Sequence, residues 1–211
     1  MAEYRLYGFG ESGNSYKAAL MLNLCGCDWE LRQVDYFGGE TRSDTFRGDV
    51  NELGEVPVLE HQGKRLTQSG VILTYVAEHT GKFGGRNEDE KLEILRWMLF
   101  DNHKFTSYFA TVRFLVGILK TGEPQAIEFL RGRALGAYSI VEKHLASSAF
   151  LLGDRPTIAD ISLAGYVYYK EESGIDRARF PNINAWAARI AALPGWKAPY
   201  DLMPPARKQT A

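Results

Sequence analysis

The spacing of hydrophobic and polar residues in the N-terminal part of the chain predicts strands and helices that alternate. Residues 29–35 alternate apolar and polar side chains, the period of a half-buried strand, and 69–79 place their apolar residues on one helical face. Gly63 separates two short runs and indicates a hairpin turn. Alternating units of this kind predict a mixed sheet with covered faces. In chain order, the expected elements are strands at 4–9 and 29–35, a helical run at 18–22, a hairpin of 56–60 with 64–66, and a helix at 69–79.

The pattern changes after residues 84–87, and the rest of the chain reads as helices separated by Gly, Pro and Asn. We therefore predict an α/β domain at 1–81, a linker at 82–90 and an all-helical domain at 91–211. The tail beyond Trp196 is expected to be extended. The predicted helices are 88–119, which could be bent, then 125–145, 158–169, and one that starts at Pro181 and ends at 193–195.

Thr157 and Asp160 have the spacing of a capping box, in which a hydroxyl and a carboxylate pair with backbone amides at a helix N-terminus. Such caps are worth about 1 kcal/mol and need not touch a ligand. Their expected role is therefore in folding.

Charge and composition exclude several classes of function. The chain has 211 residues, 45% of them hydrophobic, which is enough for a substantial core. The 25 basic residues are balanced by 26 acidic ones, and the basic residues form no cluster. We therefore expect no nucleic acid partner. No signal peptide or long apolar run is visible, so we expect no membrane association and a cytoplasmic location.

The cysteines and histidines do not form metal-ligand patterns. Cys25 and Cys27 are one residue apart, which fits neither a Cys-x-x-Cys redox motif nor a zinc site, and the four histidines are scattered. We expect reduced, buried or half-buried thiols and no metal.

Candidate chemistry begins with Pro57, which interrupts an apolar run. Proline cannot donate to a central ladder, so Pro57 must open an edge strand or sit at a special peptide bond such as a cis bond. Farther on, Gln68-Ser69 stands where a strand ends and a helix begins, a place where free amides can hold a carboxylate. Together these features suggest a pocket that grips a peptide.

With the N-terminal run Ser12-Gly13-Asn14-Ser15-Tyr16-Lys17, these motifs resemble the glutathione transferase superfamily over nearly the whole chain. The spacing of Ser12, Asn14 and Lys17 is most similar to bacterial theta-like and nu-like, serine-type members. The resemblance implies an N-terminal thioredoxin-like domain of order βαβαββα and a C-terminal helical bundle. It also implies a cytoplasmic homodimeric enzyme of detoxification, an alkyl or aryl transferase that uses glutathione as co-substrate and no metal.

The resemblance implies a role for each matching residue. Ser12 would donate a hydrogen bond to the glutathione sulfur, and Asn14 would donate a second bond or orient the first. Glu55 departs from the family pattern, where Gln or Lys is common, and its carboxylate could weaken binding of an acidic tripeptide. The implied glutathione-binding residues are Arg42 for the glycyl carboxylate, Glu55, Val56 as backbone clamp, Pro57, and Gln68 with Ser69 for the γ-glutamyl group.

Several alternatives stay open on the residues alone. Ser12 and Asn14 could merely cap the first helix, and Tyr7 is a competing hydrogen-bond donor that ranks below Ser12. The predicted activity is attack of the glutathione thiolate on small hydrophobic electrophiles or peroxides. A glutathione-dependent disulfide-bond reductase and a non-catalytic binding scaffold are the competing functions. A set of aromatic residues with one arginine could line the electrophile pocket or belong to the core: Phe9, Phe105, Tyr108, Phe109 and Arg113. The run 97–100 looks exposed and is compatible with a dimer contact.

Overall fold

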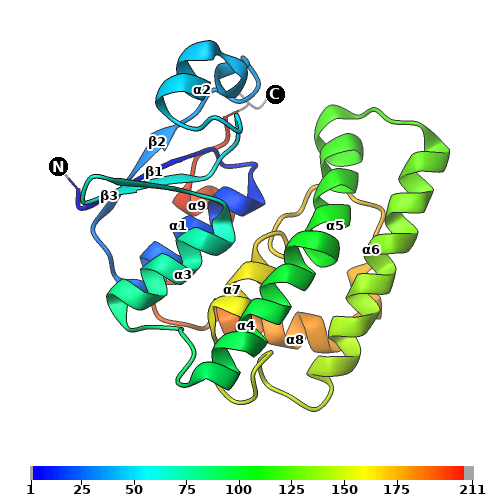
Figure 1. Cartoon of the computed structure of the whole chain (residues 1–211). Coiled ribbons are helices and arrows are strands. Elements are labelled where there is room, and N and C mark those ends of the chain that lie inside the picture. Colours follow the sequence, from blue (N-terminus) through cyan, green and yellow to red (C-terminus); the bar gives the residue numbers. More distant parts are fainter. Residues whose placement is uncertain (1, 207–211) are drawn as a thin grey trace. The chain divides into compact units, whose positions relative to one another are not determined.

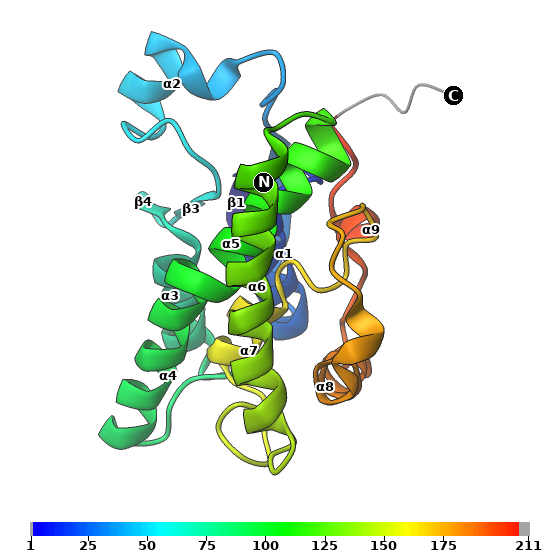
Figure 2. The ribbon, with the colours of Figure 1, turned by 90° about the vertical axis from the view of Figure 1, so that its right-hand side faces the viewer.

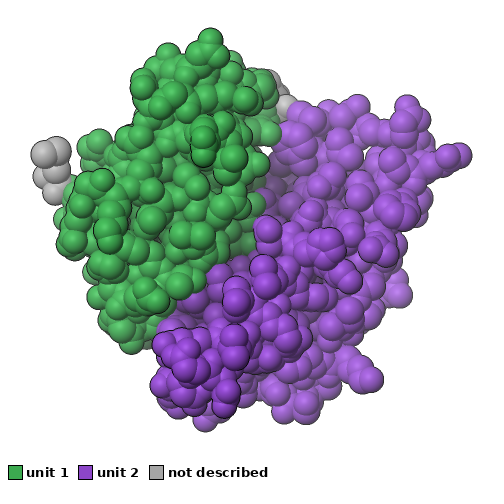
Figure 3. Space-filling view, viewed as in Figure 1, with its two compact units in different colours: residues 1–82, 193–211 green, residues 83–192 purple. Residues whose placement is uncertain are grey.

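The computed structural model describes residues 2–206, which form two compact units. One unit contains residues up to Lys82 together with the segment that begins at Leu193, and the other runs from Phe83 to Ala192 (Figure 3). The first unit is the α/β part of the chain and the second is helical.

The first unit is built on a four-stranded sheet in the order β2-β1-β3-β4. Strands β1 and β2 are parallel, whereas β3 pairs antiparallel with both β1 and β4. The predicted order βαβαββα and the mixed sheet are therefore confirmed. The elements are β1 (Tyr4–Gly8), α1 (Gly13–Cys25), β2 (Trp29–Gln33), a 3₁₀ turn (Glu40–Arg42), α2 (Asp44–Asp49), β3 (Val58–His61), β4 (Lys64–Thr67) and α3 (Ser69–Thr80).

Helices α1 and α3 pack against each other on one face of the sheet, and α2 stands clear of both (Figure 1). Helix α1 is buried almost all round, which explains its nearly continuous run of apolar residues. It ends at Gly26, whose left-handed φ of 71° suits a glycine C-cap. The core between helices and sheet includes the fully buried side chains Leu6, Leu20, Leu22, Leu59 and Ile72.

The C-terminal segment packs with the first unit, although the sequence pattern placed it with the helical domain. The Tyr16 hydroxyl donates to the carbonyl of Lys197 at 2.8 Å, and the Asn23 amide donates to the carbonyl of Gly195. The tail is also not fully extended, because α9 (Pro199–Leu202) forms a short helix. Proline is well suited to the first turn of a helix, and that signal was overlooked.

The second unit begins with one long helical path from Glu88 to Leu119, as predicted. It consists of α4 (Glu88–Phe100), α5 (Thr106–Val112) and two π-helical segments, which follow α4 and α5 respectively. Helix α6 runs back along this path (Figures 1 and 2). The remaining elements are the π segments Asp101–Phe105 and Arg113–Leu119, α6 (Pro124–Leu145), α7 (Ile158–Ala164), the 3₁₀ turn Arg177–Arg179, and α8 (Pro181–Ala191).

Helix α7 begins at the predicted capping box, which the structure confirms. The Asp160 carboxylate accepts the Thr157 backbone N–H at 2.8 Å, and the Thr157 hydroxyl accepts from the N–H of Ala159. However, the helix ends at Ala164 and not near residue 169 as expected. Val167 and Tyr169 are nevertheless buried, so the apolar pattern continues into turns where the helix does not.

Candidate functional site

The register of the sheet brings the candidate motifs of the first unit to one end. Gly8, the last residue of β1, pairs with Gln33 of the parallel strand β2, so the loops after both strands leave from the same edge. Tyr7 pairs with Val58, and Val58 with Thr67, because β3 runs in the opposite direction. The segments before β3 and after β4 therefore lie at this same edge. The predicted site residues all lie in these segments or in the first turn of the helix that follows: Ser12, Asn14, Arg42, Glu55, Val56, Pro57, Gln68 and Ser69.

Ser12 is the N-cap of α1 and is half-buried. Its side-chain oxygen accepts a hydrogen bond from the backbone N–H of Ser15 at 3.1 Å. A hydroxyl has one donor proton and two acceptor lone pairs, so this cap occupies an acceptor position and leaves the proton for another partner. The capping and catalytic interpretations of Ser12 are thus compatible.

Two polar atoms beside Ser12 are buried without a hydrogen-bond partner. They are the side-chain oxygens of Asn14 and Ser15, the second and third residues of α1. Buried polar atoms are normally paired, and each exception needs a physical explanation. The first turn of α1 also has free backbone N–H groups and the positive end of the helix dipole, which together favour an anion such as a thiolate.

Val56 lies two residues before the start of β3, and the Val56–Pro57 peptide bond is cis. Pro57 therefore does not open an edge strand, since β3 is an inner strand of the sheet. Val56 itself lies outside the β1–β3 pairing, which starts at Val58. The loop before it is held by Asn51, whose amide donates to the carbonyl of Glu55 at 2.8 Å and whose side-chain oxygen accepts from Leu53 N–H at 3.2 Å.

Gln68 precedes α3 with an unusual backbone conformation. Its φ of 66° lies in a region that L residues other than glycine rarely occupy, and its carbonyl accepts the first helical hydrogen bond from Ile72. Such outliers cluster at functional sites. The exposed Gln68 side chain donates from Nε2 to Oε2 of Glu55 at 3.1 Å, while Ser69 begins the helix.

The arginines near this edge differ in their surroundings. Arg42 is exposed at the end of the 3₁₀ turn, and its side chain lies near Gly39. Arg47, which the sequence pattern did not single out, lies beside Gly54: a Cβ at position 54 would be 3.1 Å from Arg47 Nε. The available signal in the sequence was the glycine at position 54. Its φ of 65° in the structure shows that it forms a close turn next to Glu55.

The competing candidates differ in their surroundings. Tyr7 is half-buried, with the Arg32 guanidinium 5.9 Å from its ring centre. In the helical unit, Phe105 and Phe109 are core residues stacked on Tyr138, and Arg113 is buried in an ion pair with Glu171 at 2.9 Å.

Burial raises the pKa of both cysteine thiols, that of Cys27 to about 11. Both cysteines are free, Cys25 buried and Cys27 half-buried, as expected. Their thiols are thus poor nucleophiles near neutral pH.

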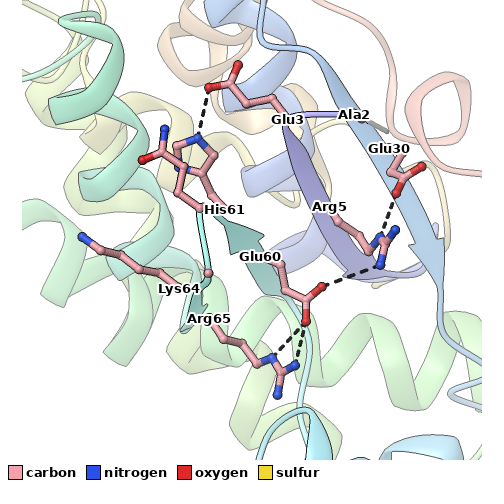
Figure 4. Close-up of a pocket in the computed structure, with 10 residues that line it drawn as sticks. Ala2, Glu3, Arg5, Glu30, Glu60, His61, Lys64 and Arg65 are labelled. Carbon is pink, nitrogen blue, oxygen red and sulfur yellow. Dashed lines mark hydrogen bonds and ion pairs between the residues drawn. The ribbon is translucent and has the colours of Figure 1, made fainter.

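A separate hollow of about 610 Å³ lies on the outer side of the sheet and is lined by charged residues (Figure 4). Arg5 pairs with Glu30 at 2.7 Å and lies 3.9 Å from Glu60, which in turn pairs with Arg65 at 2.8 Å. These four residues are neighbours in register across all four strands. Since the charges compensate one another, this row stabilises the exposed sheet face.

Two general searches complete the description of residues 2–206. No three His, Cys, Asp or Glu side chains within this range gather in a way that could hold a metal ion. Nor does this range contain a helix that is long and apolar enough to cross a membrane.

The fold is a thioredoxin-like domain joined to a helical domain, and the candidate residues gather at the end of the sheet where β1 terminates. Comparison with protein-family models agrees: residues 2–78 match the glutathione S-transferase N-terminal domain, and residues 124–189 match its C-terminal domain. The chain belongs to the glutathione S-transferase family.

Known relatives share the whole architecture but have different activities. The chain is 32% identical to a maleylacetoacetate isomerase of Rhizobium meliloti (strain 1021) over 89% of its length and 91% of the relative. It is 29% identical to the disulfide-bond oxidoreductase YfcG of Escherichia coli (strain K12), over 88% and 89% respectively. A glutathione S-transferase structure from Pseudomonas fluorescens is 33% identical with a TM-score of 0.89, over 94% of this chain and 99% of that one.

Proposed function

We propose that this protein is a serine-type glutathione transferase, in which Ser12 stabilises the thiolate of glutathione for attack on small hydrophobic electrophiles or peroxides. The observation that carries the proposal is the hydrogen bonding of the Ser12 hydroxyl. It is held at a helix N-terminus by a bond that uses only its acceptor capacity. In transfer, the sulfur would form a bond to the electrophilic carbon as that carbon loses its leaving group, while the thiol proton has already passed to solvent.

The free energy required is moderate. A free cysteine-like thiol has a pKa of about 8.5, and each unit of lowering corresponds to about 1.4 kcal/mol of extra stabilisation of the anion. A hydroxyl hydrogen bond to a charged acceptor supplies about 1.5–3 kcal/mol, and the helix N-terminus adds about 0.3–1 kcal/mol. One or two units of lowering are therefore within reach of Ser12 and α1.

A pH titration of the thiolate absorbance of protein-bound glutathione tests the proposal. S-methylglutathione, which has no ionisable thiol, provides the matched background. We expect a pKa below that of free glutathione. Binding without a shift would favour a non-catalytic scaffold, and absence of binding would show that the family relationship does not extend to this ligand.

The second candidate function is a glutathione-dependent disulfide-bond reductase. It is supported by Asn14 beside Ser12 and by the similarity to the oxidoreductase YfcG. Glutathione thiolate would attack one disulfide sulfur, and a second glutathione would release the other thiol with formation of oxidised glutathione. Turnover of hydroxyethyl disulfide and of a chloronitrobenzene separates the two activities: the reductase proposal fails if only the aryl halide reacts. Maleylacetoacetate is a useful third substrate, because an isomerase would consume no glutathione.

We also propose that the protein is a homodimer that uses an exposed apolar stripe on α4. Leu92, Leu95 and Leu99 are 63%, 50% and 61% exposed, at the spacing of one helical face. The expected exposed run 97–100 was wrong in part, since Trp97 and Met98 are buried. A stripe on a helix is self-complementary about a two-fold axis, so a second copy is the occupant we infer.

Sedimentation equilibrium of Leu95→Glu tests this assembly. The variant should be monomeric where the parent chain is dimeric, because a charge replaces an apolar contact. Leu119→Glu, which changes another exposed leucine outside the stripe, should leave the dimer intact. A monomeric parent chain, or a dimeric Leu95→Glu variant, would contradict the proposal.

A further inference from the structure

Glu55 is an acidic residue of the candidate site that is hydrogen-bonded to Gln68. Its Oε2 accepts a hydrogen bond from Gln68 Nε2 at 3.1 Å, and its carbonyl is held by the Asn51 amide at 2.8 Å. The main chain and the carboxylate of Glu55 are thus both tied to neighbouring residues. The side chain is nevertheless exposed, so the carboxylate is accessible to a ligand.

The γ-glutamyl end of glutathione carries a carboxylate and an ammonium group on the same carbon. The N-terminus of α3, which begins at Ser69, has free backbone N–H groups and a partial positive charge, and these favour the carboxylate. The same features disfavour an ammonium group, which needs a negative partner close by. Gln68 is neutral and cannot provide that charge.

We propose that the Glu55 carboxylate is the counter-charge for the α-ammonium group of the bound thiol peptide, and that the Gln68 amide positions it for this role. The inference rests on the proposed function. Its consequence is specificity: the site selects peptides whose γ-linked first residue keeps a free amino group. The residue that looks unfavourable for an acidic tripeptide would then be a positive determinant of its binding.

The experiment combines a change in the protein with a change in the ligand. Binding of glutathione and of deaminoglutathione (glutaryl-cysteinyl-glycine), which lacks only the ammonium group, is measured by calorimetry on the parent chain and on Glu55→Gln. We expect Glu55→Gln to weaken glutathione binding about tenfold and to change the analogue less than twofold. On the parent chain, the analogue should bind about tenfold more weakly than glutathione.

The opposite interpretation gives the opposite sign. If Glu55 repels the acidic tripeptide, Glu55→Gln binds glutathione more tightly, which would overturn the proposal. Equal loss of both ligands would also overturn it, because Glu55 would then act on the loop and not on the ammonium group. Glu52→Gln, a matched change of an exposed carboxylate in the same loop, should have little effect on either ligand.

Two results keep this inference separate from the proposed function. If the parent chain does not bind glutathione, the proposed function fails and the inference fails with it. If the parent chain binds glutathione with a lowered thiol pKa but does not distinguish the deamino analogue, only the inference fails. The ligand comparison on the parent chain decides the matter even if Glu55→Gln does not fold.

Discussion

Two groups of buried polar side chains, one in each unit, differ in how far their hydrogen bonds are satisfied. In the helical unit, the Asp160 carboxylate is buried and accepts from the backbone N–H groups of Leu151 and Thr157 at 2.9 and 2.8 Å, and from the Trp186 indole at 2.8 Å. In the α/β unit, the side-chain oxygens of Asn14 and Ser15 are buried with no partner. Buried polar groups that satisfy one another's hydrogen bonds stabilise a fold. Buried polar groups without a hydrogen-bond partner beside a helix N-terminus are suited to a ligand.

The largest expected effect comes from removing the fully hydrogen-bonded Asp160 carboxylate. Asp160→Ala should lower the free energy of unfolding by about 3–5 kcal/mol, because it leaves several buried donors without their acceptor. Burial raises the pKa of the Asp160 carboxyl, while its hydrogen bonds oppose that rise. The hydrogen bonds therefore stabilise the buried carboxylate. Urea denaturation measures the loss. Asp154→Ala, at an exposed carboxylate in the loop before α7, should stay within about 0.5 kcal/mol of the parent chain, and a loss below about 1 kcal/mol for Asp160→Ala would contradict the prediction.

Ser12→Ala should have a divided effect. Loss of a donor to a developing or full negative charge typically lowers turnover about 10²–10³-fold, whereas loss of an N-cap costs about 1 kcal/mol of stability. Turnover, the pKa of bound glutathione and unfolding are measured on the same preparation. Affinity for glutathione should change little, because the tripeptide is held by the other loops.

Ser43→Ala is the matched control for this variant. Ser43 caps α2 through the same interaction, accepting the Phe46 N–H at 3.1 Å, and Ser12 does so for Ser15 N–H at 3.1 Å. Both variants should lose similar stability, but only Ser12→Ala should raise the pKa of the bound thiol. An equal effect of the two variants on that pKa would assign Ser12 a capping role alone.

Asn14→Ala sharpens the contrast with Asp160. Because the Asn14 side-chain oxygen has no partner, its removal should change the free energy of unfolding by less than about 0.5 kcal/mol, despite its burial. Turnover should fall about tenfold if the amide supports the thiolate. A destabilisation of several kcal/mol would mean that Asn14 belongs to the fold in the way that Asp160 does.

Much of this contrast was predictable from the sequence where local patterns determine the structure. The strand order along the chain, the hairpin at Gly63 and the capping box of Thr157 and Asp160 depend on periodicity, turn residues and spacing. The end of α7 was not predictable in this way. Val167 and Tyr169 continue the apolar pattern and are buried, yet they lie in a turn and in the irregular segment after it. Periodicity records burial without distinguishing a helix from packed irregular structure.

The site was predictable in its residues and not in their interactions. Ser12 and Gln68 could be named from motifs at element boundaries, but the bond between Gln68 and Glu55 joins two loops, and loop conformation has no period to read. Arg47 was missed for the same reason, since only the turn at Gly54 brings that loop close to the Arg47 side chain. On α4, the composition indicated an apolar surface but not which face of the helix is covered, so Trp97 was expected outside and Leu95 was overlooked.

The smallest effect concerns the two kinds of thiol. Burial, with the nearby Cys25 and Glu3 adding to it, raises the pKa of Cys27 from 9.0 to about 11. The proposed site is expected to do the opposite to the pKa of bound glutathione. At pH 8 the thiolate fraction of Cys27 is then about a hundredfold smaller than that of an ordinary thiol, and alkylation by iodoacetamide should be slow. The rate should increase with pH until about 11. In denaturant it should become that of a free cysteine.

Turnover should not depend on these cysteines. The double variant with alanine at positions 25 and 27 is therefore expected to retain the parent turnover with an aryl halide, within about twofold, because the nucleophile is the thiolate of glutathione. Its activity on a disulfide substrate should be retained as well, since the raised pKa of both thiols makes them poorly suited to form a mixed disulfide with glutathione. Loss of the second activity alone would move the reductase chemistry from the bound tripeptide to the protein itself.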